Sequence, residues 1–262
     1  MKMKTNHIFS VCFFLIIFLQ LPTSYANPKT ITIAGAGPSA KIVSIFFDAF
    51  QAHNQQYLNI NFVTPERSIK HAGGIRWSEK HLFGRTGREL NQTEKDTQKK
   101  EILLAKIPAV FVKGKKNAIK SLSIGDLKAI YTGKIQNWKE VGGADAGIDL
   151  VGREPKEAIY SKLKQLYPFM EQSKFWFTFT RDHQVIGHMA SGRSEFSLAF
   201  GAGPNFEKNA ILKIEGEQTG VSVGLVYDIK NNNSRLLKDV NTFARSNIWK
   251  NIVVSHSYIP ID

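Results

Sequence analysis

Residues 120–160 read KSLSIGDLKAIYTGKIQNWKEVGGADAGIDLVGREPKEAIY, and this stretch decides how the fold can be assigned. Ser123 is suited to cap a helix, and Asp126 three positions later favours the positive end of that helix. Apolar residues follow at helical spacing, and Gly133 stands where a helix ends in a left-handed residue. Residues 148–151 then predict a short buried strand. The stretch therefore predicts a helix, a turn and a strand in close succession.

The end of the same stretch has the features of an anion-binding site. The predicted strand leads through residues 152–156, including Arg153, into the start of a second helix. A helix N-terminus presents free N–H groups and the positive end of the helix dipole. We therefore expect an oxyanion to bind near Arg153.

A second helix start near the beginning of the chain has similar features. Residues 30–34 predict a strand, residues 35–40 read GAGPSA, and residues 41–53 have helical spacing. Ser39 is the expected N-cap of that helix. The glycines do not match the dinucleotide-binding fingerprint, because no third glycine follows at the required position. This segment is therefore a second candidate anion loop.

Strands alternate with helices along the rest of the chain. The predicted strands at 58–63, 107–112, 196–201 and 221–227 are short and mostly apolar, as buried parallel strands are. This alternation predicts an α/β fold with mostly parallel sheets. If the strands form two small sheets, the two candidate anion sites would face each other across a cleft.

The first 26 residues have the three regions of a secretory signal peptide. Lys2 and Lys4 give a basic start, residues 8–21 are apolar, and small residues precede an expected cleavage after Ala26. A membrane anchor is the alternative, but the apolar run is short for one. Cys12, the single cysteine, lies inside this run and away from the cleavage point, so we expect no lipid anchor. The chain is therefore expected to be periplasmic or secreted.

The formal net charge of the chain is +13, of which Lys2 and Lys4 contribute two, leaving +11 after cleavage. Such a charge favours an anionic partner: a small oxyanion, an acidic surface or nucleic acid. We expect no nucleic acid, because no basic motif with interleaved aromatic residues is present. Most of the surface lysines are expected to serve solubility alone.

Catalytic and metal chemistry have little support in the sequence. No cysteine remains after cleavage, and the histidines do not have the HExxH spacing of a zinc hydrolase. We therefore expect no catalytic residue, no metal and no cofactor. Two alternatives to a binding protein stay open, a secreted phosphoester-acting enzyme and a basic surface or adhesion protein.

The central segment LSIGDLKAIYTGKIQNWKEVGG, preceded by IPAVFVKGKKN, closely resembles the periplasmic phosphate-binding proteins of ABC transporters. The resemblance extends to ITIAGAGPSAKIVSIFFDAFQ, FGRTGREL, GLVYDI and SYIPI. It implies a two-lobed periplasmic-binding-protein fold of type II with crossover hinge strands. Lobe I would comprise residues 27–108 and 221–262, and lobe II residues 109–220. The resemblance also implies a monomer that delivers its oxyanion to an ABC permease or a membrane sensor.

The resemblance also implies a set of ligand-binding residues. The first anion loop of the family falls on Ser39 and Ala40, and its arginine falls on Arg153. The aspartate that in the family accepts the proton of protonated phosphate falls on Gly87, which Arg85 and Arg88 flank as expected donors. The full expected set is Ser39, Ala40, Arg85, Thr86, Gly87, Arg88, Arg153, Lys156, Glu157 and Ala158.

Two departures from the family pattern affect the expected ligand. The family is rich in Ser, Gly and Thr after the arginine, where this chain has Lys156, Glu157 and Ala158. Glu157 would place a carboxylate near the anion unless it turns outward, and Lys156 could compensate for its charge. With Gly87 in place of the acidic acceptor, the site should not favour HPO₄²⁻ over fully ionised anions. Sulfate-like anions, phosphate esters and carboxylates are as plausible as phosphate.

Overall fold

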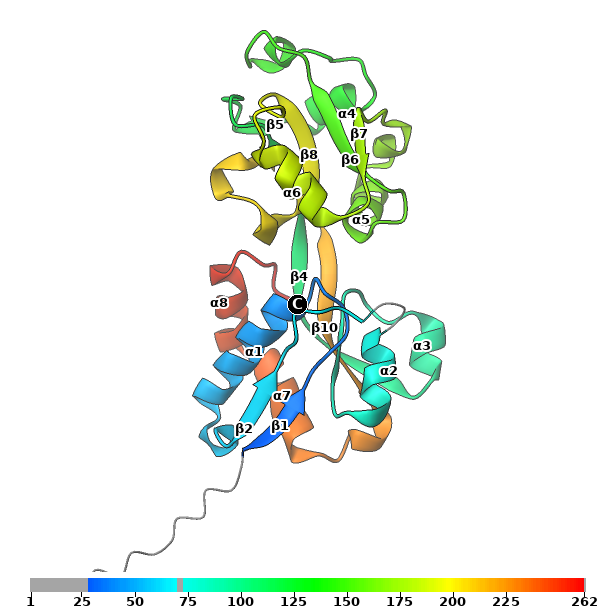
Figure 1. The fold of residues 1–262 in the computed structure, drawn as a ribbon, viewed down its shortest axis with the longest axis vertical. Helices are drawn as coiled ribbons and strands as arrows, with labels where there is room; N and C mark the ends of the chain where they lie inside the picture. Colours follow the sequence, from blue (N-terminus) through cyan, green and yellow to red (C-terminus); the bar gives the residue numbers. More distant parts are fainter. Residues whose placement is uncertain (1–27, 70–72, 262) are drawn as a thin grey trace, which may run out of the picture.

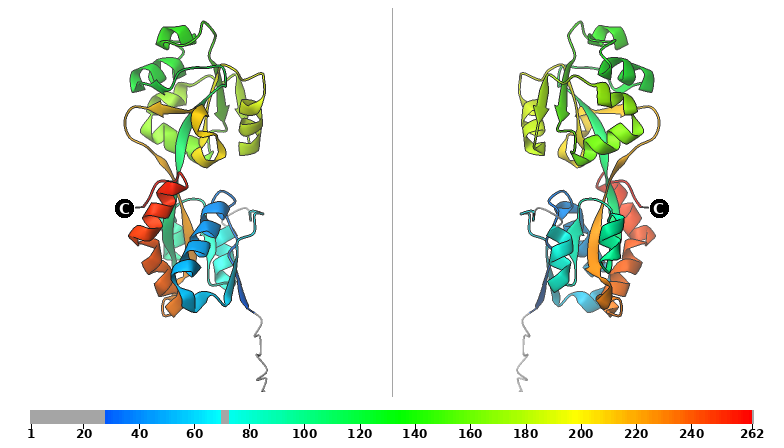
Figure 2. Two further views of the ribbon diagram at one scale, coloured as in Figure 1. Left: turned by 90° about the vertical axis from the view of Figure 1, so that its left-hand side faces the viewer. Right: turned by 90° about the vertical axis from the view of Figure 1, so that its right-hand side faces the viewer.

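A computed structural model describes residues 28–69 and 73–261. The expected signal peptide, residues 1–26, lies outside these residues. Figure 1 shows an elongated molecule in which two lobes are connected by the long strands β4 and β10. The side views in Figure 2 show the same two strands passing from one lobe to the other. No helix in the described ranges is both long enough and apolar enough to cross a membrane.

Lobe I contains a two-stranded parallel sheet, β1–β2, and an antiparallel sheet in which β10 pairs with both β3 and β4. Helix α1 connects β1 to β2, and its apolar face packs on α7 and α8 through aromatic side chains. Phe46 is fully buried and contacts the rings of Phe243 and Trp249. The elements are β1 (Lys29–Thr32), α1 (Ala40–His53), β2 (Ile60–Val63), α2 (Gly73–Lys80), β3 (Gly84–Thr86), α3 (Gln92–Asp96), α7 (Arg235–Ala244) and α8 (Asn247–Ser255).

Lobe II is built around β8, which lies between β6 and the distal half of β4. Trp138 is fully buried in this lobe, and its indole N–H donates to the carbonyl of Phe196 at 2.7 Å. The elements are β5 (Ser121–Leu122), α4 (Ile124–Tyr131), β6 (Asp149–Arg153), α5 (Ala158–Leu166), β7 (Phe177–Phe179), α6 (Asp182–Ala190), β8 (Ser197–Ala202) and β9 (Ile211–Ile214).

The hinge consists of β4 (Lys99–Lys113) and β10 (Gly220–Asp228), which pair antiparallel. Gly220 lies opposite Pro108, and β4 then continues into lobe II, where it pairs with β8 and β9. The α/β fold is thus confirmed, and its pairing is mixed rather than mostly parallel, because the two hinge strands run antiparallel to each other. The expected lobe boundaries at 108/109 and 220/221 stay a prediction.

Candidate oxyanion-binding cleft

The loop between β1 and α1 is held in one conformation by its own hydrogen bonds. Gly35 has φ of +148°, and a side chain there would meet the carbonyl oxygen of Arg85, 2.2 Å from the Cβ position. The Ala36 N–H donates to that same carbonyl at 3.1 Å. Ser39 is fully buried, and its hydroxyl donates to the Ala36 carbonyl at 3.0 Å. The expected side-chain cap by Ser39 is absent, because its hydroxyl serves the loop.

Arg85 supports this loop from beneath instead of facing the cleft as a free donor. Its side chain is fully buried and donates to the carbonyl of Ala36 at 2.7 Å and of Ile33 at 2.8 Å. A longer contact of 3.4 Å reaches the carbonyl of Arg67. Burial lowers the pKa of the Arg85 guanidinium, and no carboxylate among the described residues forms an ion pair with it. Arg85 thus hydrogen-bonds to the loop and places a positive charge under it, and its contact with a ligand stays a prediction.

The three residues after Arg85 also differ in part from their expected roles. The Thr86 hydroxyl lies 3.4 Å from the carbonyl of Gly224, across the sheet. A side chain on Gly87 would meet the Cβ of Ala36 at 3.0 Å, so this segment runs close to the loop before α1. Both terminal nitrogens of Arg88 donate to Glu94 at 2.7 Å, which raises the pKa of Arg88. The guanidinium of Arg88 thus already has a carboxylate partner, and its contact with a ligand stays a prediction.

One cavity brings residues from both lobes together. It has a volume of about 320 Å³ and lies between the β1–α1 loop, the start of α2, the Thr86–Gly87 segment and the start of α5. Ala158 is the lining residue that comes from lobe II. The lining residues that the sequence predicted are Arg85, Thr86, Gly87, Arg88 and Ala158.

A larger cavity of about 830 Å³ shares Pro38 with the first and extends along the other side of α1. Ala40 and Lys41 line it from lobe I, and Asp182 and His183 line it from lobe II. The sequence analysis did not predict Lys41, Asp182 or His183 as residues of the cleft. Lys41 follows the candidate loop directly and could have been found, whereas nothing near Asp182 in the sequence indicates that it meets Arg153.

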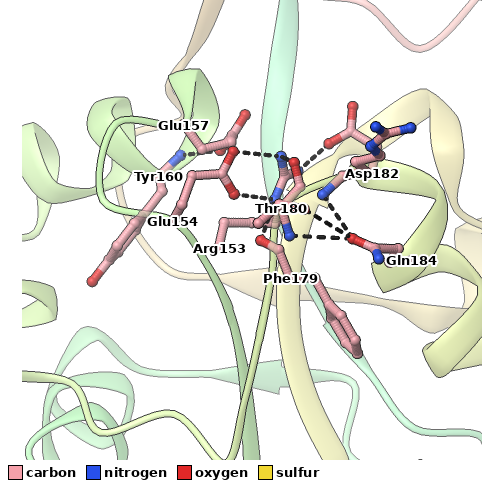
Figure 3. A network of polar contacts seen from close by, with 9 residues as sticks. Arg153, Glu154, Glu157, Tyr160, Phe179, Thr180, Asp182 and Gln184 are labelled. Carbon is pink, nitrogen blue, oxygen red and sulfur yellow. Dashed lines mark hydrogen bonds and ion pairs between the residues drawn. The ribbon is translucent and has the colours of Figure 1, made fainter.

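In lobe II, Arg153 lies at the end of β6 within a network of polar contacts (Figure 3). Its Nε donates to Glu154 at 3.2 Å and to the carbonyl of Phe179 at 3.1 Å, and Nη1 binds the Asp182 carboxylate. Its Nη2 lies 3.3 Å from the carbonyl of Thr180 and 3.4 Å from Glu154. Burial alone would lower the pKa of Arg153, but the contacts with the two carboxylates raise it. The donors that were expected to hold an oxyanion are thus occupied by groups of the chain itself.

The start of α5 is likewise occupied by an internal carboxylate. Glu157 is the N-cap residue, and its Oε2 accepts from the backbone N–H of Tyr160 at 2.7 Å. This is the position at which a helix N-terminus would otherwise bind an external anion. Glu157 therefore does not turn away from the helix start. Lys156 is exposed and forms no ion pair with another residue in the described ranges.

Comparison with known proteins identifies relatives of this chain. Two curated relatives match in part: the phosphate-binding protein PstS of Borreliella burgdorferi is 33% identical over 81 residues, and that of Bacillus subtilis is 57% identical over 35 residues. These matches span 29% and 12% of the length of the two relatives.

Solved structures match over most of the chain. A putative phosphate ABC transporter substrate-binding protein from Clostridium perfringens, with bound phosphate, has a TM-score of 0.62 at 20% identity, covering 89% of this chain and 100% of its own. An ABC-type phosphate transport receptor from Vibrio cholerae has a TM-score of 0.55 at 19% identity, covering 87% and 99%. Residues 22–180 match the family model described as a PBP superfamily domain. The chain therefore belongs to the PBP superfamily.

Proposed function

We propose that the chain is an exported solute-binding protein that captures a small oxyanion of the phosphate type in the interlobe cleft. Delivery to an ABC permease or a membrane sensor would follow capture. The family membership supports this proposal, and so do the phosphate-binding proteins among its relatives. The observation that carries it is the cavity of about 320 Å³, which the β1–α1 loop and the start of α5 line from opposite lobes.

Capture would proceed by closure of the two lobes about the hinge strands. The N-terminus of α1 offers backbone N–H groups and the positive end of its dipole. The buried charge of Arg85 beneath the loop strengthens this potential, because no carboxylate of the described residues forms an ion pair with it. Movement about β4 and β10 would then bring Ala158 and Arg153 towards an anion bound at the loop.

Titration calorimetry with a panel of anions tests this function. The panel contains phosphate, sulfate, a phosphate ester and a carboxylate, and the protein is purified without phosphate buffer. Saturable one-to-one binding of at least one oxyanion is expected. Turnover of the ester would instead support the secreted enzyme, and an absence of both would support the basic surface protein.

The variant Arg153→Ala tests whether lobe II takes part in binding. We expect it to abolish oxyanion binding, because Glu154 and Asp182 lose the cation that neutralises them and would then repel an anion in the cleft. The matched control is Arg193→Ala, which changes an exposed arginine. Unchanged anion affinity in Arg153→Ala, with a normal thermal unfolding midpoint, would remove Arg153 from the site.

A further inference from the structure

His188 on α6 lies against the two aromatic side chains of β7. The centroid of its ring is 4.8 Å from that of Phe177 and 5.5 Å from that of Phe179. Its Nε2 atom is buried and has no hydrogen-bond partner in the described part of the chain. Burial lowers the pKa of His188, and the carboxylate of Asp149 on β6 opposes this shift. The neutral imidazole therefore fits this environment better than the imidazolium does.

The other charged groups around α6 lie at its two ends. Strands β7 and β8, which pack against the helix, contain no charged or titratable residue. The start of the helix carries three exposed ionisable residues: Arg181, Asp182 and His183. Near its other end, Lys113 and Lys115 each donate to a main-chain carbonyl. Among the described residues, Asp149 is thus the charged group that alters the pKa of His188.

Helix α6 and strand β7 both supply partners of Arg153 (Figure 3). Asp182 in the first turn of α6 binds Nη1 of the guanidinium. The carbonyl of Phe179 at the end of β7 accepts from Nε at 3.1 Å, and the carbonyl of Thr180 lies 3.3 Å from Nη2. The packing of α6 on β7 therefore decides whether Arg153 keeps Asp182 as a partner.

We propose that His188 is a pH-sensitive switch that controls access to Arg153. Neutral His188 holds α6 on β7 and so keeps Asp182 on Arg153, whereas its protonation loosens α6 and releases Nη1 to an anion in the cleft. This inference rests on the proposed function and adds a regulation of the same site. An arginine whose donors are occupied at neutral pH can then take part in capture at lower pH.

The direction of the pH effect follows from the burial of the His188 ring. A histidine whose folded pKa lies below its unfolded value of about 6.5 stabilises its contacts above that value. This contribution is lost as the pH falls through the folded pKa, because the imidazolium would be buried without an acceptor. Acidification should therefore weaken the contact between α6 and β7.

Hydrogen exchange of the ligand-free protein tests the switch without any anion. The protection of the α6 amides is expected to fall at least about threefold between about pH 7.5 and about pH 5.5. In His188→Phe the contacts with Phe177 and Phe179 can persist without a titratable ring, so this difference should disappear. The matched variant His183→Gln changes the exposed histidine of the same helix and should retain the difference.

Calorimetry with sulfate and phosphate at the same two pH values connects the switch to binding. The ratio of the parent's affinity to that of His188→Phe cancels the titration of the anion itself. We expect this ratio to be at least about threefold larger at the lower pH. Asp182→Asn removes the charge that holds Arg153, so its sulfate affinity at the higher pH should approach that of the parent at the lower pH. This variant decides the question even if His188→Phe is unstable.

The outcomes separate the switch from the proposed function. Protection or an affinity ratio that does not depend on pH overturns the switch, and so does a pH dependence that His183→Gln removes. Oxyanion capture then stands if sulfate or phosphate still binds. If neither anion binds at either pH, both the switch and oxyanion capture are overturned. Thermal unfolding midpoints close to that of the parent show that each variant is folded.

Discussion

Arg85 of lobe I and Arg153 of lobe II occupy comparable positions with opposite electrostatic surroundings. Each guanidinium is buried and donates to main-chain carbonyls of a segment that leads into a helix, α1 for Arg85 and α6 for Arg153. Arg85 has no carboxylate partner in the described part of the chain, and burial lowers its pKa. Arg153 binds Glu154 and Asp182, and its pKa is raised.

The same arrangement, a buried arginine beside a helix start, therefore occurs in two different electrostatic environments. The environments differ in whether nearby carboxylates neutralise the guanidinium and occupy the helix N-terminus. Among the described residues of lobe I neither occurs: Arg85 forms no ion pair, and the hydroxyl of Ser39 donates to the loop. In lobe II both occur, through Asp182 and Glu157.

The variant Arg85→Met removes the buried guanidinium of lobe I and with it the positive charge beneath the β1–α1 loop. The carbonyls of Ile33 and Ala36 lose their buried donor, so we expect the free energy of unfolding to fall by about 3 kcal/mol or more and anion binding to disappear. Chemical denaturation measures the first effect and calorimetry the second. The matched control Arg88→Met changes an exposed arginine and should have a far smaller effect. Equal losses in both variants would contradict the supporting role of Arg85.

The variant Gly35→Ala tests the loop itself without changing any charge. With φ of +148° and the Arg85 carbonyl 2.2 Å from the Cβ position, a methyl group forces the loop away from β3. We expect destabilisation of about 2 kcal/mol and weaker anion binding. The control Gly187→Ala adds a methyl group on α6 with no atom within 4 Å, and it should stabilise the protein slightly. If Gly35→Ala binds anions with unchanged affinity, the loop conformation is not required for binding.

Local features of the central stretch could be predicted from the sequence. Helix α4 begins after Ser123, whose hydroxyl accepts from the Asp126 N–H at 3.0 Å, and Gly133 has φ of +76°. Arg153 lies at the end of a strand as expected. These features depend on contacts between residues a few positions apart in the sequence. The spacing and type of the residues were therefore sufficient to predict them.

Features that depend on distant contacts could not be predicted. Asp182 is 29 positions from Arg153, and Arg85 is 49 positions from Ala36. Strand β4 also begins at Lys99, well before the predicted 107–112, because pairing with β10 and the contact of the Lys99 ammonium with Asp228 at 3.1 Å stabilise a polar strand end. The sequence therefore indicated which residue types lie near the cleft, but not which partners they already have.

The variant Gly87→Asp gives lobe I a carboxylate and so makes it more like lobe II. The new carboxylate can accept a hydrogen bond from the P–OH group of protonated phosphate but repels a fully ionised anion, so the preference for phosphate over sulfate should rise by about tenfold. The Cβ would meet the Ala36 Cβ at 3.0 Å, which requires a small shift of the loop. Calorimetry with both anions measures the ratio, and the thermal unfolding midpoint reports the cost of the shift. An unchanged ratio would show that Gly87 does not discriminate between the anions.

The smallest expected loss of stability is that of an Arg88 variant. Arg88 lies beside the β1–α1 loop, and its guanidinium forms an ion pair with Glu94. The hydrogen bond from Arg88 holds the pKa of Glu94 below its usual range, although burial opposes this. A carboxyl whose folded pKa is lowered stabilises the protein above the unfolded value of about 4.3, and this contribution is lost as the pH falls through the folded pKa. Arg88→Met should therefore cost at most about 1 kcal/mol at pH 7, because the arginine is 54% exposed.

That cost should fade as the pH is lowered below about 4, where Glu94 becomes protonated in both proteins. Urea denaturation of the parent and of Arg88→Met across this pH range measures the difference, and calorimetry at neutral pH measures anion affinity. We expect the affinity to change little, because the Arg88 guanidinium is already paired with Glu94. A pH-independent difference in stability, or a large loss of affinity, would show that Arg88 acts on the ligand and not on Glu94. Both Arg85 and Arg88 would then contribute positive charge beside the β1–α1 loop.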